Sequence, residues 1–161
     1  MKKQNGRLGF TLVEMLVVVL IIGVLSSVAI PNYTRSIEKS RATEAMNMVK
    51  ALNDAVYAYA AERNACPPSF SKLLVEVPGN KTSDTVVTGK YFKYMLNAAT
   101  NAPIPGTFCG GVVAERIDGD IYRIWNPYST AGGKRTLACN GDTARAQNIC
   151  KSMGLATNER P

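Results

Sequence analysis

The chain has 161 residues, of which 46% are hydrophobic and 19% charged, a length that allows one modest domain and one special segment. Its formal charge is +7, but three cations precede an apolar run and the others are scattered, so charge alone does not indicate nucleic-acid binding. The chain has no histidine, G-x-S-x-G pattern or P-loop, which argues against an enzyme and leaves no cofactor expected.

The first predicted element is an apolar helix from Phe10 to Ile30. At ~1.5 Å per residue, a helix of this length matches the ~30 Å hydrocarbon core of a bilayer. Lys2, Lys3 and Arg7 place the amino terminus in the cytoplasm by the positive-inside rule, so the bulk of the chain is expected across the membrane. A cleaved secretory signal is the alternative, but SSVAIPNY offers only a poor small-x-small cleavage site. We therefore expect the apolar segment to be retained.

An amphipathic helix is predicted to continue from Tyr33 to about Ala65. Apolar residues recur there at three- and four-residue spacing, and polar residues occupy the opposite face. The apolar positions are Ala45, Met48, Val49, Leu52, Val56, Tyr59 and Ala60, and the polar ones are Lys50, Asn53, Asp54 and Glu62. The helix is expected to stop near Asn64, because Cys66-Pro67-Pro68 cannot continue it.

Pro31 lies inside this long helix, where it removes one backbone hydrogen bond and crowds the preceding turn. Gly23, Ser26 and Ser27 lie just upstream. The segment from Gly23 to Pro31 is therefore the predicted place for a kink or local unwinding.

The remainder is predicted to be small and to begin with a connecting region, residues 66–107. Its apolar pieces FSKLLVEV and YFKYMLNA predict one or two short helices. Further on, FCGGVVAER and DIYRIWN flank Asp118-Gly119, a pair that favours a tight hairpin, and KRTLAC can add a third strand. The segment from Asp142 to Met153 predicts a short capped helix or loop, closed by Gly154. Three or four antiparallel strands are expected to cover the long helix.

Four cysteines, Cys66, Cys109, Cys139 and Cys150, all follow the apolar segment. An even number in an oxidising extracytoplasmic space favours disulfides, and three pairings are possible. Zinc is disfavoured because there is no CxxC pair and no histidine. The aspartates at positions 118, 120 and 142 do not have the spacing of a recognised calcium loop, so no metal is expected.

The sequence KKQNGRLGFTLVEMLVVVLIIGVLSSVAIPNYTRS resembles the amino terminus of type IV pilins and of the related type II secretion pseudopilins. The likeness rests on a short basic leader that ends in Gly9, then Phe10, a Thr-Leu-x-Glu sequence, and an apolar helix with Pro31 at the expected place. The resemblance implies that a membrane prepilin peptidase cuts between Gly9 and Phe10. It also implies that the new amino group of Phe10 is methylated.

The resemblance further implies an α+β type IV pilin fold, in which a long amino-terminal α-helix with a hydrophobic first half packs on a small antiparallel β-sheet head. The implied ranges are a leader over 1–9, a transmembrane and filament-core half-helix over 10–31, an amphipathic half-helix over 32–65, the connecting region over 66–107, and the sheet with a C-terminal disulfide loop over 108–161. The loop favours Cys139–Cys150, as in many type IV pilins, which leaves Cys66–Cys109.

Glu14 is the only charged residue between Arg7 and Arg35, and it lies within the apolar segment. A carboxylate at such a depth costs at least ~2.5 kcal/mol. In a filament core it can pair with the amine at Phe10 of an adjacent subunit, and a buried pair can fix register even where desolvation cancels its attraction. We interpret Glu14 as the residue that sets the axial offset of each subunit. The alternative is a structural glutamate that snorkels to the headgroups.

The sequence thus predicts a structural subunit of a type IV pilus, first a single-pass inner-membrane precursor and then part of an extracellular filament on the bacterial surface. The resemblance implies as partners other copies of the chain, the prepilin peptidase and N-methyltransferase, and an inner-membrane assembly platform with its ATPases. A type II secretion pseudopilin or a minor pilin is the nearer alternative. The distant alternative is a membrane-tethered extracytoplasmic binding domain for which the helix is only an anchor.

Overall fold

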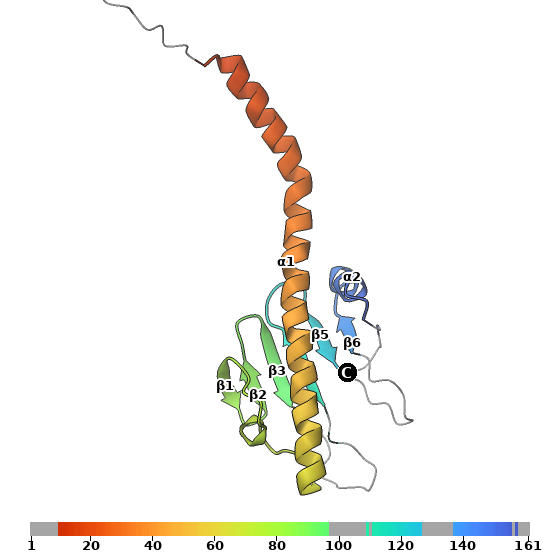
Figure 1. Cartoon of the computed structure of the whole chain (residues 1–161). Coiled ribbons are helices and arrows are strands. Elements are labelled where there is room, and N and C mark those ends of the chain that lie inside the picture. The colour runs from red at the N-terminus through yellow and green to blue at the C-terminus, as the bar shows by residue number, and fades with distance from the viewer. Residues whose placement is uncertain (1–9, 97–108, 110, 127–136, 156, 158–161) are drawn as a thin grey trace, which may run out of the picture. The chain divides into compact units, whose positions relative to one another are not determined.

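A computed structural model describes residues 10–96, 109, 111–126, 137–155 and 157. Its longest element is helix α1, Leu12–Arg63, and a single 3₁₀ turn, η1 Phe70–Lys72, a six-stranded sheet and helix α2 follow (Figure 1). The chain divides into two compact units, residues 1–37 and 38–161, and α1 contributes to both. We call the second unit the head. The predicted α+β class with a long amino-terminal helix is confirmed.

The end of α1 lies where the sequence predicts it. Its last residue is Arg63, and Asn64 adopts a left-handed backbone conformation with a φ of 49°. Asparagine tolerates this conformation, which commonly closes helices, and Cys66-Pro67-Pro68 cannot resume one. The expected stop near Asn64 is therefore confirmed.

Helix α1 continues through both Gly23 and Pro31, so the local unwinding considered for this segment does not occur. Side chains support the turns around the proline: Asn32 Nδ2 donates to Val28 O at 3.2 Å, and Thr34 Oγ1 donates to Pro31 O at 3.0 Å. These bonds engage backbone carbonyls near the point where proline removes a donor. A kink at Gly23 and Pro31 stays a prediction.

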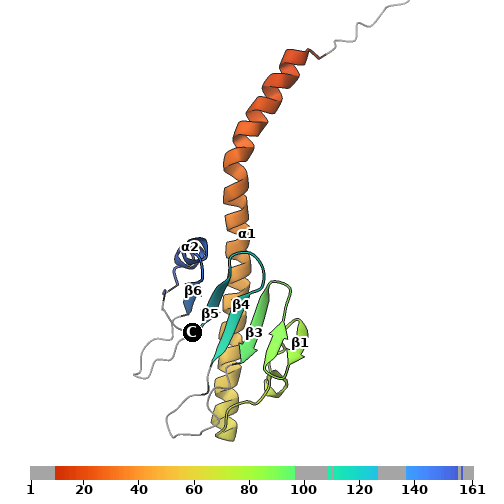
Figure 2. The ribbon, with the colours of Figure 1, turned by 180° about the vertical axis from the view of Figure 1, so that it is seen from behind.

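The six strands form one antiparallel sheet in which each strand pairs with the next along the chain (Figures 1 and 2). They are β1 Asn80–Ser83, β2 Val86–Thr88, β3 Phe92–Leu96, β4 Val112–Arg116, β5 Tyr122–Trp125 and β6 Ala138–Gly141. The sequence analysis expects three or four strands, all after residue 107. This expectation is wrong, because β1, β2 and β3 lie within the supposed connecting region and make half of the sheet.

The strand β3 shows why that expectation fails. It occupies the piece YFKYMLNA, for which the sequence analysis expects a short helix. Phe92, Tyr94 and Leu96 are buried, whereas Lys93 and Met95 between them are partly exposed, so the side chains alternate with the period of two that defines a strand. Aromatic residues at alternate positions favour this conformation. The other piece, FSKLLVEV, forms only the 3₁₀ turn η1.

Strands β4 and β5 form the hairpin predicted around Asp118-Gly119. The connection is longer than the expected tight turn, because residues 117–121 separate the two strands. Gly119 has a φ of 78°, a left-handed value that glycine adopts without strain. The third strand predicted in KRTLAC corresponds to β6, and residues 134–136 of that piece lie outside the described part of the chain.

Helix α2, Ala144–Ser152, is the short capped helix predicted near the carboxy terminus. The Thr143 side chain caps it by accepting a hydrogen bond from Ala146 N at 3.1 Å, and Gly154 follows with a φ of 70°. The helix packs against β6 at Gly141, where an added Cβ would lie 2.5 Å from Ala146. Only glycine permits this close approach.

The core of the head lies between one face of α1 and the inward face of the sheet, which runs along the second half of the helix (Figures 1 and 2). The buried residues of α1 are Ala42, Ala45, Val49, Leu52, Asn53 and Val56. Four of the seven predicted apolar positions are among them, and Met48, Tyr59 and Ala60 are partly exposed. The prediction that Asn53 lies on the polar face is wrong, because only 1% of this residue is exposed.

Candidate assembly site

The first unit presents a continuous apolar surface. Every large apolar side chain from Phe10 to Tyr33 is exposed, with exposed fractions between 45% and 79%. By length and composition, this part of α1 is long and apolar enough to cross a membrane. Such a surface requires a cover, which a bilayer or the same surface of other copies can supply.

Thr11 and Glu14 form a reciprocal cap at the start of α1. Glu14 Oε2 accepts hydrogen bonds from Thr11 N at 2.9 Å and from Thr11 Oγ1 at 2.7 Å, and Glu14 N donates to Thr11 Oγ1 at 3.3 Å. This is the capping-box arrangement of Thr-x-x-Glu. The carboxylate therefore has partners within its own chain. The sequence analysis missed this role of Thr11, although the spacing of the two residues signals it.

The structure places the other predicted amino-terminal residues as follows. Gly9 lies outside the described residues, and Phe10 is 78% exposed. Gly23 has open space around it, since an added Cβ would meet nothing within 4 Å. Cleavage after Gly9, methylation of Phe10 and the register role of Glu14 stay predictions.

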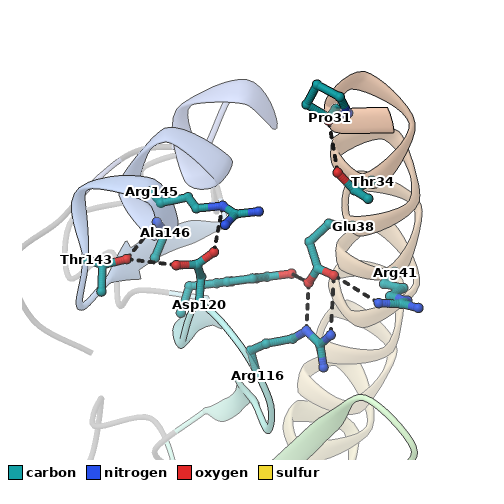
Figure 3. A network of polar contacts seen from close by, with 10 residues as sticks. Pro31, Thr34, Glu38, Arg41, Arg116, Asp120, Thr143, Arg145 and Ala146 are labelled. Carbon is teal, nitrogen blue, oxygen red and sulfur yellow. Dashed lines mark hydrogen bonds and ion pairs between the residues drawn. The ribbon is translucent and has the colours of Figure 1, made fainter. Parts of the chain in front are cut away.

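Within the head, Glu38 is the centre of a polar network that joins α1 to β4 and β5 (Figure 3). Its Oε1 accepts hydrogen bonds from Arg116 Nε at 2.7 Å and from Tyr122 OH at 2.9 Å. Its Oε2 lies 3.3 Å from both Arg116 Nη2 and Arg41 Nη1. Arg116 Nη1 also donates to Tyr91 O at 2.9 Å. We call Glu38, Arg116 and Tyr122 the Glu38 clamp.

The clamp keeps the Glu38 carboxyl ionised, so that it accepts hydrogen bonds, and the Tyr122 phenol protonated, so that it donates one. Burial raises the pKa of the Glu38 carboxyl, but the hydrogen bonds from Arg116 and Tyr122 outweigh burial, so this pKa lies below its ordinary value of 4.5. Burial and the nearby Glu38 carboxylate raise the pKa of the Tyr122 phenol. Sequence reasoning did not find the clamp, because 78 residues separate Glu38 from Arg116 and no local pattern links them.

Asn53 joins the middle of the head part of α1 to the start of β4. Its Nδ2 donates to Val49 O at 2.8 Å, and its Oδ1 accepts from Val112 N at 3.0 Å. Gly111 permits this contact, because a Cβ there would lie 2.7 Å from Asn53 Oδ1. The buried amide thus aligns β4 with the helix, and both of its polar ends are satisfied.

The four cysteines form two disulfides, Cys66–Cys109 and Cys139–Cys150, which is the pairing that the sequence analysis favours. The first joins residues 43 apart and ties the chain after α1 to the segment before β4. The second joins residues 11 apart, and its two cysteines are fully buried between β6 and α2. Both bridges restrict the unfolded chain, and the longer loop does so more strongly.

Two of the three aspartates considered for calcium, Asp120 and Asp142, contact protein cations, and Asp120 also accepts a hydrogen bond from a hydroxyl. Asp120 Oδ1 accepts from Thr143 Oγ1 at 3.3 Å, and Asp120 Oδ2 lies 3.0 Å from Arg145 Nε (Figure 3). Asp142 Oδ1 lies 3.7 Å from Arg123 Nη1. Among the described residues, no group of three or more histidine, cysteine, aspartate or glutamate side chains is placed to hold a metal ion. The Asp120 contacts join the β4–β5 loop to the start of α2, and the Asp142 contact joins the residue after β6 to β5.

Comparisons with known proteins agree with this architecture. Residues 1–30 match the family described as the prokaryotic N-terminal methylation motif. The chain is 24% identical over 151 residues to fimbrial protein EcpC of Eikenella corrodens, which covers 92% of this chain and 94% of the relative. It is 35% identical over 95 residues to type II secretion system core protein G of Vibrio cholerae, and this match covers 58% of this chain and 65% of the relative. It is 28% identical over 117 residues to type IV major pilin protein PilE1 of Neisseria gonorrhoeae, and this match covers 73% of this chain and 67% of the relative.

Three features therefore coincide in one chain: an amino-terminal methylation motif, a long helix with an exposed apolar first part, and an antiparallel head with a carboxy-terminal disulfide. The relatives include both fimbrial proteins and a secretion-system core protein. Together these findings support membership of the type IV pilin superfamily.

Proposed function

We propose that this chain is a structural subunit of a type IV pilus. The observation that carries the proposal is the apolar surface of the first unit, which is exposed from Phe10 to Tyr33 and begins within the methylation motif. Cleavage between Gly9 and Phe10 frees an amino group at the start of this surface, and this group is then methylated. The subunit first spans the inner membrane and afterwards joins an extracellular filament on the bacterial surface.

Assembly covers the apolar surface with the same surface of other copies. Burial at ~25 cal/mol per Å² supplies cohesion, and the removal of the same surface from lipid offsets part of it. A contact that repeats by rotation and translation does not close, so it produces a helical fibre and not a ring. The partners in this scheme are the prepilin peptidase and N-methyltransferase, and an inner-membrane assembly platform with its ATPases.

Glu14 sets the register of each incoming subunit in this proposal. In the lone subunit, the cap with Thr11 gives the carboxylate hydrogen-bond partners inside the apolar segment. In the filament, the amine of Phe10 of an adjacent copy becomes its partner. The carboxylate is therefore bonded in both states, and only the correct axial offset brings the amine to it.

The first experiment is intact-mass measurement with amino-terminal sequencing of protein sheared from the cell surface. A chain that begins at N-methylated Phe10 and contains both disulfides supports processing and surface assembly together. A chain that stays in the membrane and still begins at Met1 rejects the proposal. That result favours the membrane-tethered binding domain, in which the helix is only an anchor.

A type II secretion pseudopilin or minor pilin is the second candidate, because the match to protein G of Vibrio cholerae reaches 35% identity. The Cys139–Cys150 loop supports the pilin instead. Electron microscopy of cells at native expression separates the candidates. Long surface filaments made of this chain favour the pilin, and their absence together with a secretion defect in a deletion strain favours the pseudopilin.

The register role of Glu14 is tested by the variant Glu14→Gln. Glutamine can still accept the hydrogen bonds of the capping box, so the cap is kept while the charge is removed. We expect the yield of sheared filament to fall at least about tenfold, which corresponds to ~1.4 kcal/mol. The control is Glu44→Gln, the same chemical change on an exposed part of α1. A Glu14→Gln variant that assembles normal filaments would reject this role.

A further inference from the structure

Three cations surround the ring of Tyr91 in the head. Arg41 Cζ lies 4.3 Å from the ring centroid, Lys90 Nζ lies 5.1 Å from it, and Arg116 Cζ lies 5.6 Å from it. The negative face of an aromatic ring attracts cations at such distances. The tyrosine therefore gathers positive charge from α1, from β4 and from Lys90, which lies two residues before β3.

Within the described part of the chain, Glu38 is the one carboxylate that contacts these cations. Arg116 and Tyr122 occupy its Oε1, and Arg116 and Arg41 share its Oε2 at 3.3 Å each (Figure 3). Lys90 is exposed, and among the described residues no carboxylate oxygen lies within 4 Å of its nitrogen. We define Arg41, Lys90 and Tyr91 as the cationic patch, and this patch has an unmatched positive charge.

The outward face of α1 in the head has unmatched negative charge. Asp54 and Glu62 are exposed, and in the described part of the chain neither lies within 4 Å of a cationic nitrogen. At ~1.5 Å per residue they lie ~20 Å and ~32 Å beyond Arg41 along the helix. Glu44 differs from them, because it acts on the head of its own chain: burial first, and then the Glu44 carboxylate, raise the pKa of the Tyr94 phenol. Two other acids that have no ion pair among the described residues, at positions 76 and 118, lie outside α1.

We propose that the cationic patch is an assembly contact that binds the outward acidic face of α1, at Asp54 or Glu62, in a second copy of this chain. The inference rests on the proposed function and adds a contact between heads to it. Parallel subunits displaced by ~20–32 Å along a common axis bring the patch of one copy beside these acids of the next. Complementary charge on two separate surfaces of one chain suits a contact that repeats without closing.

A polyanion is a poorer fit to the patch. Nucleic-acid binding depends on many phosphate contacts, whereas the patch has two cations, one of which is already shared with Glu38. Arg41 lies over the Tyr91 ring, so this face of the ring is not available for a stacked base. A single carboxylate that bridges Arg41 and Lys90 matches the available charge.

The test reverses charges singly and in pairs in the full chain, produced in cells that assemble filaments. Lys90→Glu and Glu62→Lys are each expected to lower the yield of sheared filament about fivefold or more, since an attraction becomes a repulsion of similar size. Asp54→Lys is made in parallel. We expect the double variant of Lys90→Glu with one of the two acid reversals to return the yield to within about twofold of the wild type. Lys72→Glu, the same change at an exposed lysine outside the patch, is the matched control and is expected to leave the yield unchanged.

The outcomes show whether the contact exists and whether Asp54 or Glu62 is the partner. Rescue by one double variant identifies its acid as the partner. Three results would overturn the inference. The first is a wild-type filament yield from Lys90→Glu, and the second is a loss of yield in Lys72→Glu equal to that in Lys90→Glu. The third is a loss in the single variants that neither double variant rescues. Lys90 lies outside the Glu38 clamp, and the unfolding of each variant, followed by Trp125 fluorescence, verifies that its head is intact. A wild-type chain that forms no filament in this experiment contradicts the proposed function itself, so the two failures are distinct.

Discussion

Glu38 and Arg116 face each other with side chains that are 17% and 7% exposed. Because both are shielded from water, removing one charge leaves the other buried without a partner, which costs more than the intact pair contributes. We expect Glu38→Gln to lower the free energy of unfolding by about 2–4 kcal/mol. The measurement is denaturant unfolding of the full chain in detergent, followed by the fluorescence of Trp125, the chain's single tryptophan.

The matched control for this prediction is Glu115→Gln on the outer face of the sheet. Its partners Lys93 and Arg123 are 38% and 36% exposed, so solvent screens both pairs. The loss of unfolding free energy is expected to stay below about 1 kcal/mol. Equal losses in the two variants would show that the Glu38 clamp contributes no more than a surface ion pair.

Acid sensitivity of the head also depends on the charge of Glu38. Its pKa in the folded chain lies below the ordinary value of 4.5, so its contribution to stability is fully present above about that pH and is lost as the pH falls through the lower, folded pKa. The hydrogen bond from Arg123 lowers the pKa of Glu115 in the same direction. We expect unfolding measurements from about pH 7 to about pH 3 to show a smaller acid-induced loss in Glu38→Gln than in the wild type. The same loss in both proteins would contradict this assignment.

At the scale of elements, the Asn53 amide aligns β4 with α1 through Val112. Asn53→Leu leaves the buried Val112 N–H without its acceptor, and we expect a loss of about 1–3 kcal/mol in unfolding free energy. Gly111→Ala is expected to cost a similar amount, because its Cβ would press against Asn53 Oδ1. Denaturant unfolding measures both. Gly23→Ala, where an added Cβ meets nothing within 4 Å, is the control and should leave head unfolding unchanged.

The sequence predicts the bounds of the long helix α1 better than it predicts the short strands β1, β2 and β3. The extent of α1 follows from a long apolar run, a three- to four-residue periodicity and the Cys66-Pro67-Pro68 stop, which are all local signals. The short strands before residue 97 have weaker signals, because three to five residues show only one or two alternations. Their identity becomes clear only when neighbouring strands supply hydrogen-bond partners.

At the scale of the whole molecule, the head begins at Glu38, which is the centre of the Glu38 clamp, and the buried core of the head begins at Ala42. We therefore expect a chain of residues 38–161 to fold on its own as a soluble monomer with both disulfides. A chain of residues 42–161 lacks Glu38 and Arg41 and leaves Arg116 unpaired, so we expect its unfolding free energy to be about 2–4 kcal/mol lower. Size-exclusion chromatography and denaturant unfolding compare the two. A 38–161 chain without a cooperative transition would mean that the head depends on the first unit.

The sequence by itself determined the membrane-length apolar segment, the methylation motif over residues 1–30, the isolated charge at Glu14 and the end of α1. Each of these depends on residues that are close together along the chain, where composition and periodicity suffice. Only the tertiary structure decided the six-stranded sheet, the Glu38 clamp, the contact of Asn53 with β4 and the cationic patch. The clamp joins residues 78 apart, the Asn53 contact joins residues 59 apart, and the patch joins Arg41 to Tyr91, which is 91 − 41 = 50 residues further along the chain. Such groups acquire their burial and their partners only when the chain has packed.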